Sequence, residues 1–382
     1  MNMAYVKTSV AVQLLLCIMS WGCIYSVVSA QLPPVPAPLA ADKTGLAAIE
    51  STFAAAYPGQ SPTRFERQPQ KPGPLPLILA YKASQPEPHW HYVTAGFSEI
   101  AGKKNKDPKV SGLGFELTIR VARIADETPT SQDKVQEAPE WPTQLLQGLA
   151  LHIYRSKSAL LPSHYLNLNA PIRAQHATKL HALTFQPDAI APTVQSVNGA
   201  FNLVQAMGVT VDELGLIERW SSRAVIDLLN QTHPGGITKL ERQSILLDRK
   251  IAAKAVQGMR IDGSDTDRVL VPDLSWERPR PEGPIEIRFG RAYAETIRGV
   301  LKGRLPFERH LILIGPSLAV RLDARSYSEC SIADKLLQLE LDPGAVDELA
   351  ESLRGDGTQR AEPQKEIRFR LDALPDLEFV LQ

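Results

Sequence analysis

The chain has 382 residues, which is enough for two domains of ordinary size. Hydrophobic residues make up 43% of the sequence and charged residues 22%, a composition typical of soluble globular proteins. Lys and Arg together number 42, as do Asp and Glu, so the formal net charge is zero. This balance gives no electrostatic case for a nucleic-acid partner, although it does not exclude a local basic patch.

The first 30 residues differ in character from the rest. Lys7 precedes an apolar stretch from Val10 to Val28, and Val28-Ser29-Ala30 offers the small residues that a signal peptidase requires. Residues 1–30 are therefore expected to be a signal peptide, and the protein to be exported to the periplasm or envelope. An uncleaved anchor is an alternative, with membrane contact only through residues 10–28, because about 20 apolar residues span a bilayer. A misassigned start codon, and hence a cytoplasmic protein, is a third reading.

A proline-rich spacer is expected over residues 31–42, followed by a first domain over residues 43–272. Helical spacing of Leu46, Ile49 and Phe53 predicts a helix that ends at Tyr57-Pro58-Gly59. Further elements are predicted in chain order as strands over 77–81, 91–97 and 115–122, a helix that begins at Trp141-Pro142, and helices over 214–230 and 245–259.

A linker is predicted over residues 273–284, which contain three prolines, and a second domain over residues 285–382. Residues 331–341 fit either a strand or a helix, and a helix is predicted from Asp342 to Leu353. Strands are predicted over 285–289, 308–314, 318–323, 366–371 and 377–381. The expected fold class is therefore α+β, with two mixed α/β domains.

Two histidines beside a carboxylate offer the strongest chemical candidate. His89 and His91 share one face of a strand and could chelate a metal, with Glu116 as an acid, in an exported metal-dependent enzyme. Against this, the neighbouring sequence supplies no third ligand. Glu116 alternates with Phe115 and Leu117, which predicts the wetter face of its strand. The simpler interpretation is that Trp90 and Tyr92 pack inward while the histidines contact water or backbone carbonyls.

Other motifs fail as sites. The acidic segment 262–267 lacks the glycine spacing and the terminal glutamate of a calcium loop, and the pattern Gly112-x-Gly114 continues to Leu117 instead of a third glycine. Cys330 is the single cysteine left after cleavage at Ala30, and we expect it to be an apolar filler. We therefore predict no catalytic residues, no metal site, no cofactor and no enzymatic activity.

These residues resemble the Suppressor of fused family, in the compact form of its bacterial members. The resemblance begins at Gly45–Ile49 with Tyr57–Gln60 and covers nearly everything from residue 43 onward. Its further motifs are His89-Trp90-His91-Tyr92, Gly112–Thr118, Trp141-Pro142, Leu146–Ala150, Thr210–Leu214, Asp262-Gly263-Ser264, Leu301–Leu305 and Leu374-Pro375-Asp376. It implies two domains that form a clamp on a partner peptide, held as an added strand between them, without catalysis.

The resemblance also implies the binding residues. Tyr154, His164 and Leu301 match partner-contacting positions of the family, and Ser163 stands where the family has an acid. The lost acid and a shortened insertion at about 265–284 argue for a partner different from the animal one. The hypothesis is a non-enzymatic module that sequesters a protein partner, possibly as an immunity protein against a toxin. The alternatives are the exported metal enzyme and an anchored envelope scaffold.

Overall fold

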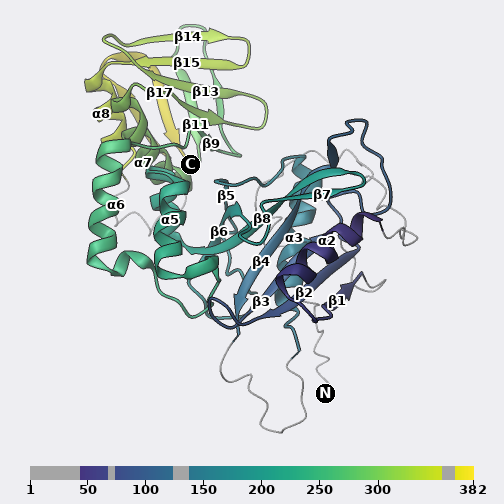
Figure 1. The fold of residues 1–382 in the computed structure, drawn as a ribbon. Coiled ribbons are helices and arrows are strands. Elements are labelled where there is room, and N and C mark those ends of the chain that lie inside the picture. The colour runs from purple at the N-terminus through teal and green to yellow at the C-terminus, as the bar shows by residue number, and fades with distance from the viewer. Residues whose placement is uncertain (1–43, 68–73, 124–136, 355–365) are drawn as a thin grey trace, which may run out of the picture. The chain divides into compact units, whose positions relative to one another are not determined.

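The computed structural model describes residues 44–67, 74–123, 137–354 and 366–382. Within these residues the chain forms two compact units (Figure 1). The first contains residues 44–211 and 226–245, and the second contains residues 212–225 and 246–382. The predicted α+β fold of two mixed units is confirmed. The predicted segments 1–30 and 31–42 lie outside the described residues, and no described helix has the length and hydrophobicity to cross a membrane.

An eight-stranded mixed sheet forms the centre of the first unit. Its strand order is β1-β2-β3-β4-β8-β6-β5, and β7 pairs with β8. Neighbouring strands are antiparallel except for β4 and β8, which run parallel. The strands are β1 (Thr63–Glu66), β2 (Leu77–Ala83), β3 (His89–Ala95), β4 (Val110–Ala122), β5 (Tyr165–Asn167), β6 (Leu180–Pro187), β7 (Thr193–Ser196) and β8 (Gly199–Thr210).

Both faces of this sheet are covered, as the positions of α2 and α3 in Figure 1 illustrate. Helix α2 (Thr44–Ala56) buries Ile49 and Phe53 in a core with Leu79 and Val93. Helix α3 (Trp141–Ser156), which starts at the predicted residue with proline in its first turn, packs on the opposite face. Its partners there include Phe115, Leu117 and Ile119 of β4. The result is a three-layer unit in which residues 115–121 of β4 are buried on both faces.

The predicted helix over 214–230 is instead two helices, α4 (Val211–Arg219) and α5 (Ser222–Thr232). The break lies at Trp220 and Ser221, because Trp220 O accepts from Asp265 N–H at 2.7 Å and Ser221 Oγ accepts from the N–H of Ala224 in α5. The Trp220 Nε1 also donates to Asp262 Oδ2 at 2.9 Å. The predicted helix over 245–259 becomes a 3₁₀ turn, η3 (Ile245–Leu247), followed by α6 (Arg249–Asp262). Asp248 caps α6, because its side chain accepts from the backbone N–H groups of residues 250 and 251.

The second unit has two sheets around one hydrophobic core. One sheet has the order β10-β11-β17-β16 and the other the order β14-β15-β13-β12-β9. The strands are β9 (Arg268–Leu270), β10 (Ser275–Glu277), β11 (Ile285–Phe289), β12 (Leu311–Ile314), β13 (Ala319–Ala324), β14 (Glu329–Ala333), β15 (Leu336–Leu341), β16 (Ile367–Leu371) and β17 (Leu374–Leu381). Helices α7 (Ala294–Arg304) and α8 (Pro343–Ser352) complete it, and residues 331–341 are strands β14 and β15 with a turn.

The division into units differs from the expected boundary at residues 273–284. That segment contains β10, which pairs with β11 in the second unit. Helix α6 also belongs to the second unit, although the sequence placed it in the first domain. The physical reason is its contact with Trp220: a Cβ on Gly258 of α6 would lie 2.1 Å from the indole Cζ2.

Candidate functional site

Tyr154 lies near the C-terminal end of α3, in the first unit. Its ring stacks on Phe97 with 5.9 Å between the centroids, and its hydroxyl donates to Gly96 O at 3.1 Å. Burial raises the pKa of Tyr154, and the nearby charge of Glu116 adds to this effect. The side chain is half-buried, so one part of it anchors the loop after β3 while the rest meets solvent.

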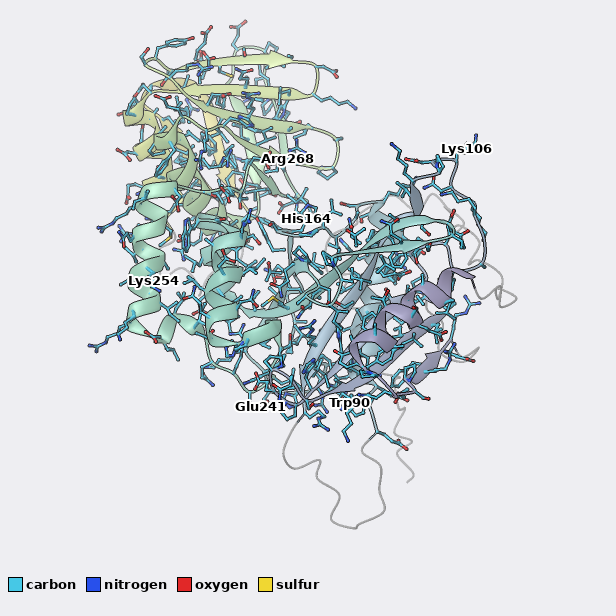
Figure 2. All side chains as sticks on the ribbon, in the orientation of Figure 1. Trp90, Lys106, His164, Glu241, Lys254 and Arg268 are labelled. Atoms are coloured by element: carbon cyan, nitrogen blue, oxygen red, sulfur yellow. The ribbon has the colours of Figure 1, made fainter. Side chains whose placement is uncertain are left out.

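Ser163 and His164 immediately precede β5, and both side chains are exposed. Ser163 has a positive φ of 69°, and its N–H donates to Phe185 O at 2.8 Å. His164 O accepts from Phe185 N–H at 3.1 Å. Figure 2 labels His164 at this position. Backbone bonds to β6 thus fix both residues at the start of β5.

Strand β5 ends the sheet order, so it pairs with β6 on one side and with no described strand on the other. Leu168 N–H donates to His181 O at 3.0 Å, and His164 O accepts from β6. Even-numbered residues therefore direct their peptide groups toward β6, and by alternation Asn167 directs its own to the open side. An open edge of this kind can accept a further strand.

Leu301, the fourth predicted residue, lies in α7 of the second unit. Its side chain is completely buried in the core of that unit, with Leu322 and Leu339 in the same cluster. The second unit has an edge strand of its own, β9, which pairs only with β12 among the described strands. Leu270 of β9 is 62% exposed.

The two histidines of the metal hypothesis are buried, so the expected contact with water is wrong, whereas the expected contact with a backbone carbonyl is confirmed for His89. Both ring nitrogens of His91 have partners: Nε2 lies 2.9 Å from Asp188 Oδ2, and Nδ1 lies 2.9 Å from Tyr57 Oη. His89 is 1% exposed, with Nδ1 2.8 Å from Glu87 O. Among the described residues, no group of three His, Cys, Asp or Glu side chains is placed to hold a metal ion.

Asp188 is the centre of a buried polar cluster that the sequence did not reveal. It accepts hydrogen bonds from Thr118 Oγ1 at 2.6 Å and from Arg120 Nη2 at 2.9 Å, besides its contact with His91. Burial lowers the pKa of His91, although the contact with Asp188 opposes this shift. Burial alone would raise the pKa of Asp188, but the contacts with His91, Arg120 and Thr118 outweigh it and lower that pKa. The cluster is an internal ion pair that joins β3, β4 and the loop after β6.

Glu116 is fully buried, and the prediction of a wetter face was wrong because α2 covers that side of β4. Its Oε1 accepts from the N–H groups of Gly96, Phe97 and Ser98 at 2.8–3.0 Å and from Ser98 Oγ at 2.6 Å, and its Oε2 accepts from Thr94 Oγ1. Burial raises the pKa of Glu116 to about 7, although these hydrogen bonds oppose the rise. The carboxylate fixes the turn after β3, to which Tyr154 also binds.

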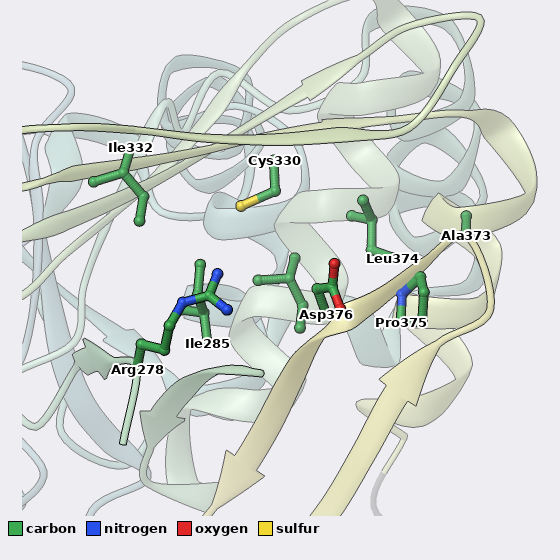
Figure 3. Close-up of a pocket in the computed structure, with 9 residues that line it drawn as sticks. Arg278, Ile285, Cys330, Ile332, Ala373, Leu374, Pro375 and Asp376 are labelled. Atoms are coloured by element: carbon green, nitrogen blue, oxygen red, sulfur yellow. The ribbon is translucent and has the colours of Figure 1, made fainter. Parts of the chain in front are cut away.

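The second unit contains a hollow of about 440 Å³ (Figure 3). Figure 3 shows the Cys330 thiol together with Arg278 and Asp376, and apolar side chains such as Leu374 complete the lining. Burial raises the pKa of the Cys330 thiol. The thiol is therefore protonated at neutral pH and packs against the core, in line with the role of an apolar filler.

Comparison with known sequences finds a family match that lies mostly within the first unit. Residues 73–243 match the sequence model of the family described as Suppressor of fused protein (SUFU). The Suppressor of fused homolog of Homo sapiens is 27% identical over 215 residues, and that of Mus musculus is 26% identical over 215 residues. Residues 73–243 therefore belong to the Suppressor of fused family. The match covers 52% of this chain and 42% of each relative, so it spans less than half of their length.

Solved structures of Suppressor of fused proteins share the fold. The crystal structure of Drosophila Suppressor of Fused superposes with a TM-score of 0.71 at 20% sequence identity, covering 89% of this chain and 97% of that one. The Sufu–Fu complex crystal structure matches with a TM-score of 0.52 at 25% identity, covering 56% of this chain and 96% of that one. The Suppressor of fused fold therefore extends beyond the part that the family sequence model matches.

Proposed function

We propose that this Suppressor of fused family member is a non-enzymatic binding protein, which sequesters a protein partner by adding a segment of it as a strand to the open edge of β5. The observation that carries the proposal is the side of β5 at Asn167 that pairs with no described strand, next to the exposed Ser163 and His164. Strand addition is a common way to bind peptides, because backbone hydrogen bonds supply affinity and alternate side chains supply specificity. The solved Sufu–Fu complex supports a protein partner for a relative of this chain.

The residues at this edge suit recognition. Asn167 offers peptide groups for the added strand, each bond contributing about 0.5–1.5 kcal/mol. His164 supplies a side chain that can donate or accept next to it. Ser163 carries no charge, so it favours a neutral group on the partner, where the family acid would favour a basic one.

The partner that we propose is a protein toxin, which the chain neutralises as an immunity protein. The resemblance of this chain to the compact bacterial members of the Suppressor of fused family supports a toxin as the partner. The replacement of the family acid by Ser163 supports it as well. With residues 1–30 as an export signal or anchor, the toxin is met outside the cytoplasm. Coexpression with the protein encoded by the neighbouring gene tests this: growth is rescued if that protein is a toxin, and absence of both toxicity and binding contradicts it.

Strand addition has its own test, which needs no knowledge of the natural partner. Twelve-residue peptides selected by phage display on the purified protein are measured for affinity against two variants at one position. Asn167→Pro removes an N–H that faces the open side and spares the bonds to β6, whereas Asn167→Ala keeps that N–H. We expect Asn167→Pro to lower the affinity for the peptides at least 10-fold and Asn167→Ala to lower it less than 3-fold. Equal affinity for both variants would rule out the β5 edge.

A further inference from the structure

Helix α6 presents a basic face to solvent. Arg249, Lys250, Lys254 and Arg260 are all exposed, and Figure 2 labels Lys254 among them. At 100° per residue, Lys250 and Lys254 form one row along the 14-residue helix, and Arg249 and Arg260 form a second row beside it. The arc between and around these rows contains no acidic residue. The four positive charges therefore spread over about 17 Å of one face.

No acidic side chain of the described residues neutralises this face. None of the four cations lies within 4.0 Å of a described carboxylate. The two aspartates at the ends of α6 are occupied elsewhere, since Asp248 caps the helix and Asp262 accepts from Trp220. The face thus keeps an uncompensated positive potential, in a chain whose total charge is zero.

Apolar and small side chains lie among the cations. Val256 is 44% exposed and Ile261 is 65% exposed. Ala253, also exposed, falls between the lysine row and the arginine row. At Ala253 the backbone of a second helix can approach closely, because the spacing of packed helices depends on the side chains at the contact, and the exposed Gln257 one turn further along can hydrogen-bond to that helix. Cations on both sides of such a line complement acidic residues that flank an apolar stripe.

We propose that the exposed face of α6 docks an acidic amphipathic helix of a protein partner. It uses no residue of β5 and belongs to the other unit, so it stands independently of the strand-addition proposal. The contacts favour a protein helix over two other polyanions. A bilayer surface requires a broad apolar sector, but Ile251 and Ala255 on the apolar side of α6 are buried in the protein. Single-stranded nucleic acid requires aromatic platforms, and α6 contains no aromatic residue.

The test uses a labelled 21-residue peptide with an apolar stripe flanked by glutamates, and measures fluorescence anisotropy at low salt. A peptide of the same composition with the glutamates distributed around the helix is the peptide control. Charge reversal at Lys250→Glu and Lys254→Glu together should weaken binding at least 10-fold. The matched protein control is Lys104→Glu with Lys106→Glu, two exposed lysines of the first unit with the same change in net charge, and it should change binding less than 2-fold.

A further variant separates helix docking from general attraction. Ala253→Gln keeps the net charge of the protein but prevents close approach of the peptide helix to α6. It should therefore lower the affinity for the peptide with the apolar stripe several-fold and leave the affinity for the control peptide unchanged. The proposal is overturned if the Lys250/Lys254 variant binds like the wild type, or if Ala253→Gln has no effect on the striped peptide. It is equally overturned if phosphatidylserine vesicles or a 20-base-pair DNA bind this face more tightly than the peptide. All the substituted side chains are exposed, and circular dichroism is the check that each variant folds.

Discussion

Replacing Asp188 by asparagine tests the buried cluster of the first unit most directly. The carboxylate is 1% exposed and contacts Arg120, which is 5% exposed, at 2.9 Å. Removing one partner of a buried ion pair leaves the other charge uncompensated, at a cost of about 3–5 kcal/mol. Asparagine keeps the size of the side chain but places an amide among the donors of His91 and Thr118. We therefore expect Asp188→Asn to destabilise the first unit by about 3–5 kcal/mol.

Hydrogen–deuterium exchange of β3 and β4 measures this loss locally, which matters because a chain of two units need not unfold in one step. At 1.4 kcal/mol per factor of ten, the open population should rise roughly 10²- to 4 × 10³-fold. The matched control is Glu295→Gln, which removes a carboxylate that is 67% exposed and 3.3 Å from Arg298. That surface pair should contribute less than about 1 kcal/mol.

A double-mutant cycle with Arg120→Met separates the pair from its surroundings. Removing both charges should cost less than the sum of the single changes, by at least about 1.5 kcal/mol. Because the contacts of Asp188 lower its pKa in the folded state, its contribution is present at neutral pH and is lost as the pH falls through the folded pKa. Additive effects, or a loss below 1 kcal/mol for Asp188→Asn, would refute the assignment of a buried ion pair.

Three further changes give defined outcomes. Glu116→Gln should lower the free energy of unfolding, measured in urea, by about 1–3 kcal/mol at pH 5. The difference between variant and wild type should narrow by pH 7, because the raised folded pKa of about 7 means that the wild type loses stability as the pH rises towards that value. A difference that widens with pH contradicts this. Gly258→Ala should destabilise the second unit by about 1–3 kcal/mol and change Trp220 fluorescence, since the new Cβ meets the indole; stabilisation, as expected for alanine in a free helix, would show that α6 does not pack there. Tyr154→Phe removes the hydrogen bond to Gly96 O and should lower the free energy of unfolding by only about 1 kcal/mol. Tyr154→Ala also removes the ring and should lower it by about 3–5 kcal/mol. Equal losses for the two variants would mean that the ring contributes no packing.

Local patterns located most elements of the fold, and the misses have physical causes. The helix at Trp141-Pro142 and the strand over 115–122 were predicted from proline position and alternation, and both are confirmed. The start of β4 was missed, because it contains the bulge at Gly112 and Gly114, both with positive φ. The continuous helix over 214–230 was wrong because Trp220 makes its contacts with α6, far away in sequence.

The amino-acid sequence by itself determined the alternation of apolar residues, the caps, the mixed α/β composition and the motifs of the family, because each of these depends on neighbours a few positions apart. Only the tertiary structure decided which polar residues are buried. Alternation along the strand predicted that Glu116 faces solvent, but α2 packs on the same face of the sheet and Glu116 is buried. His91 finds its charged partner 97 positions away in the chain. The open side of β5 likewise depends on the order of strands in the sheet, which is set by packing between distant segments.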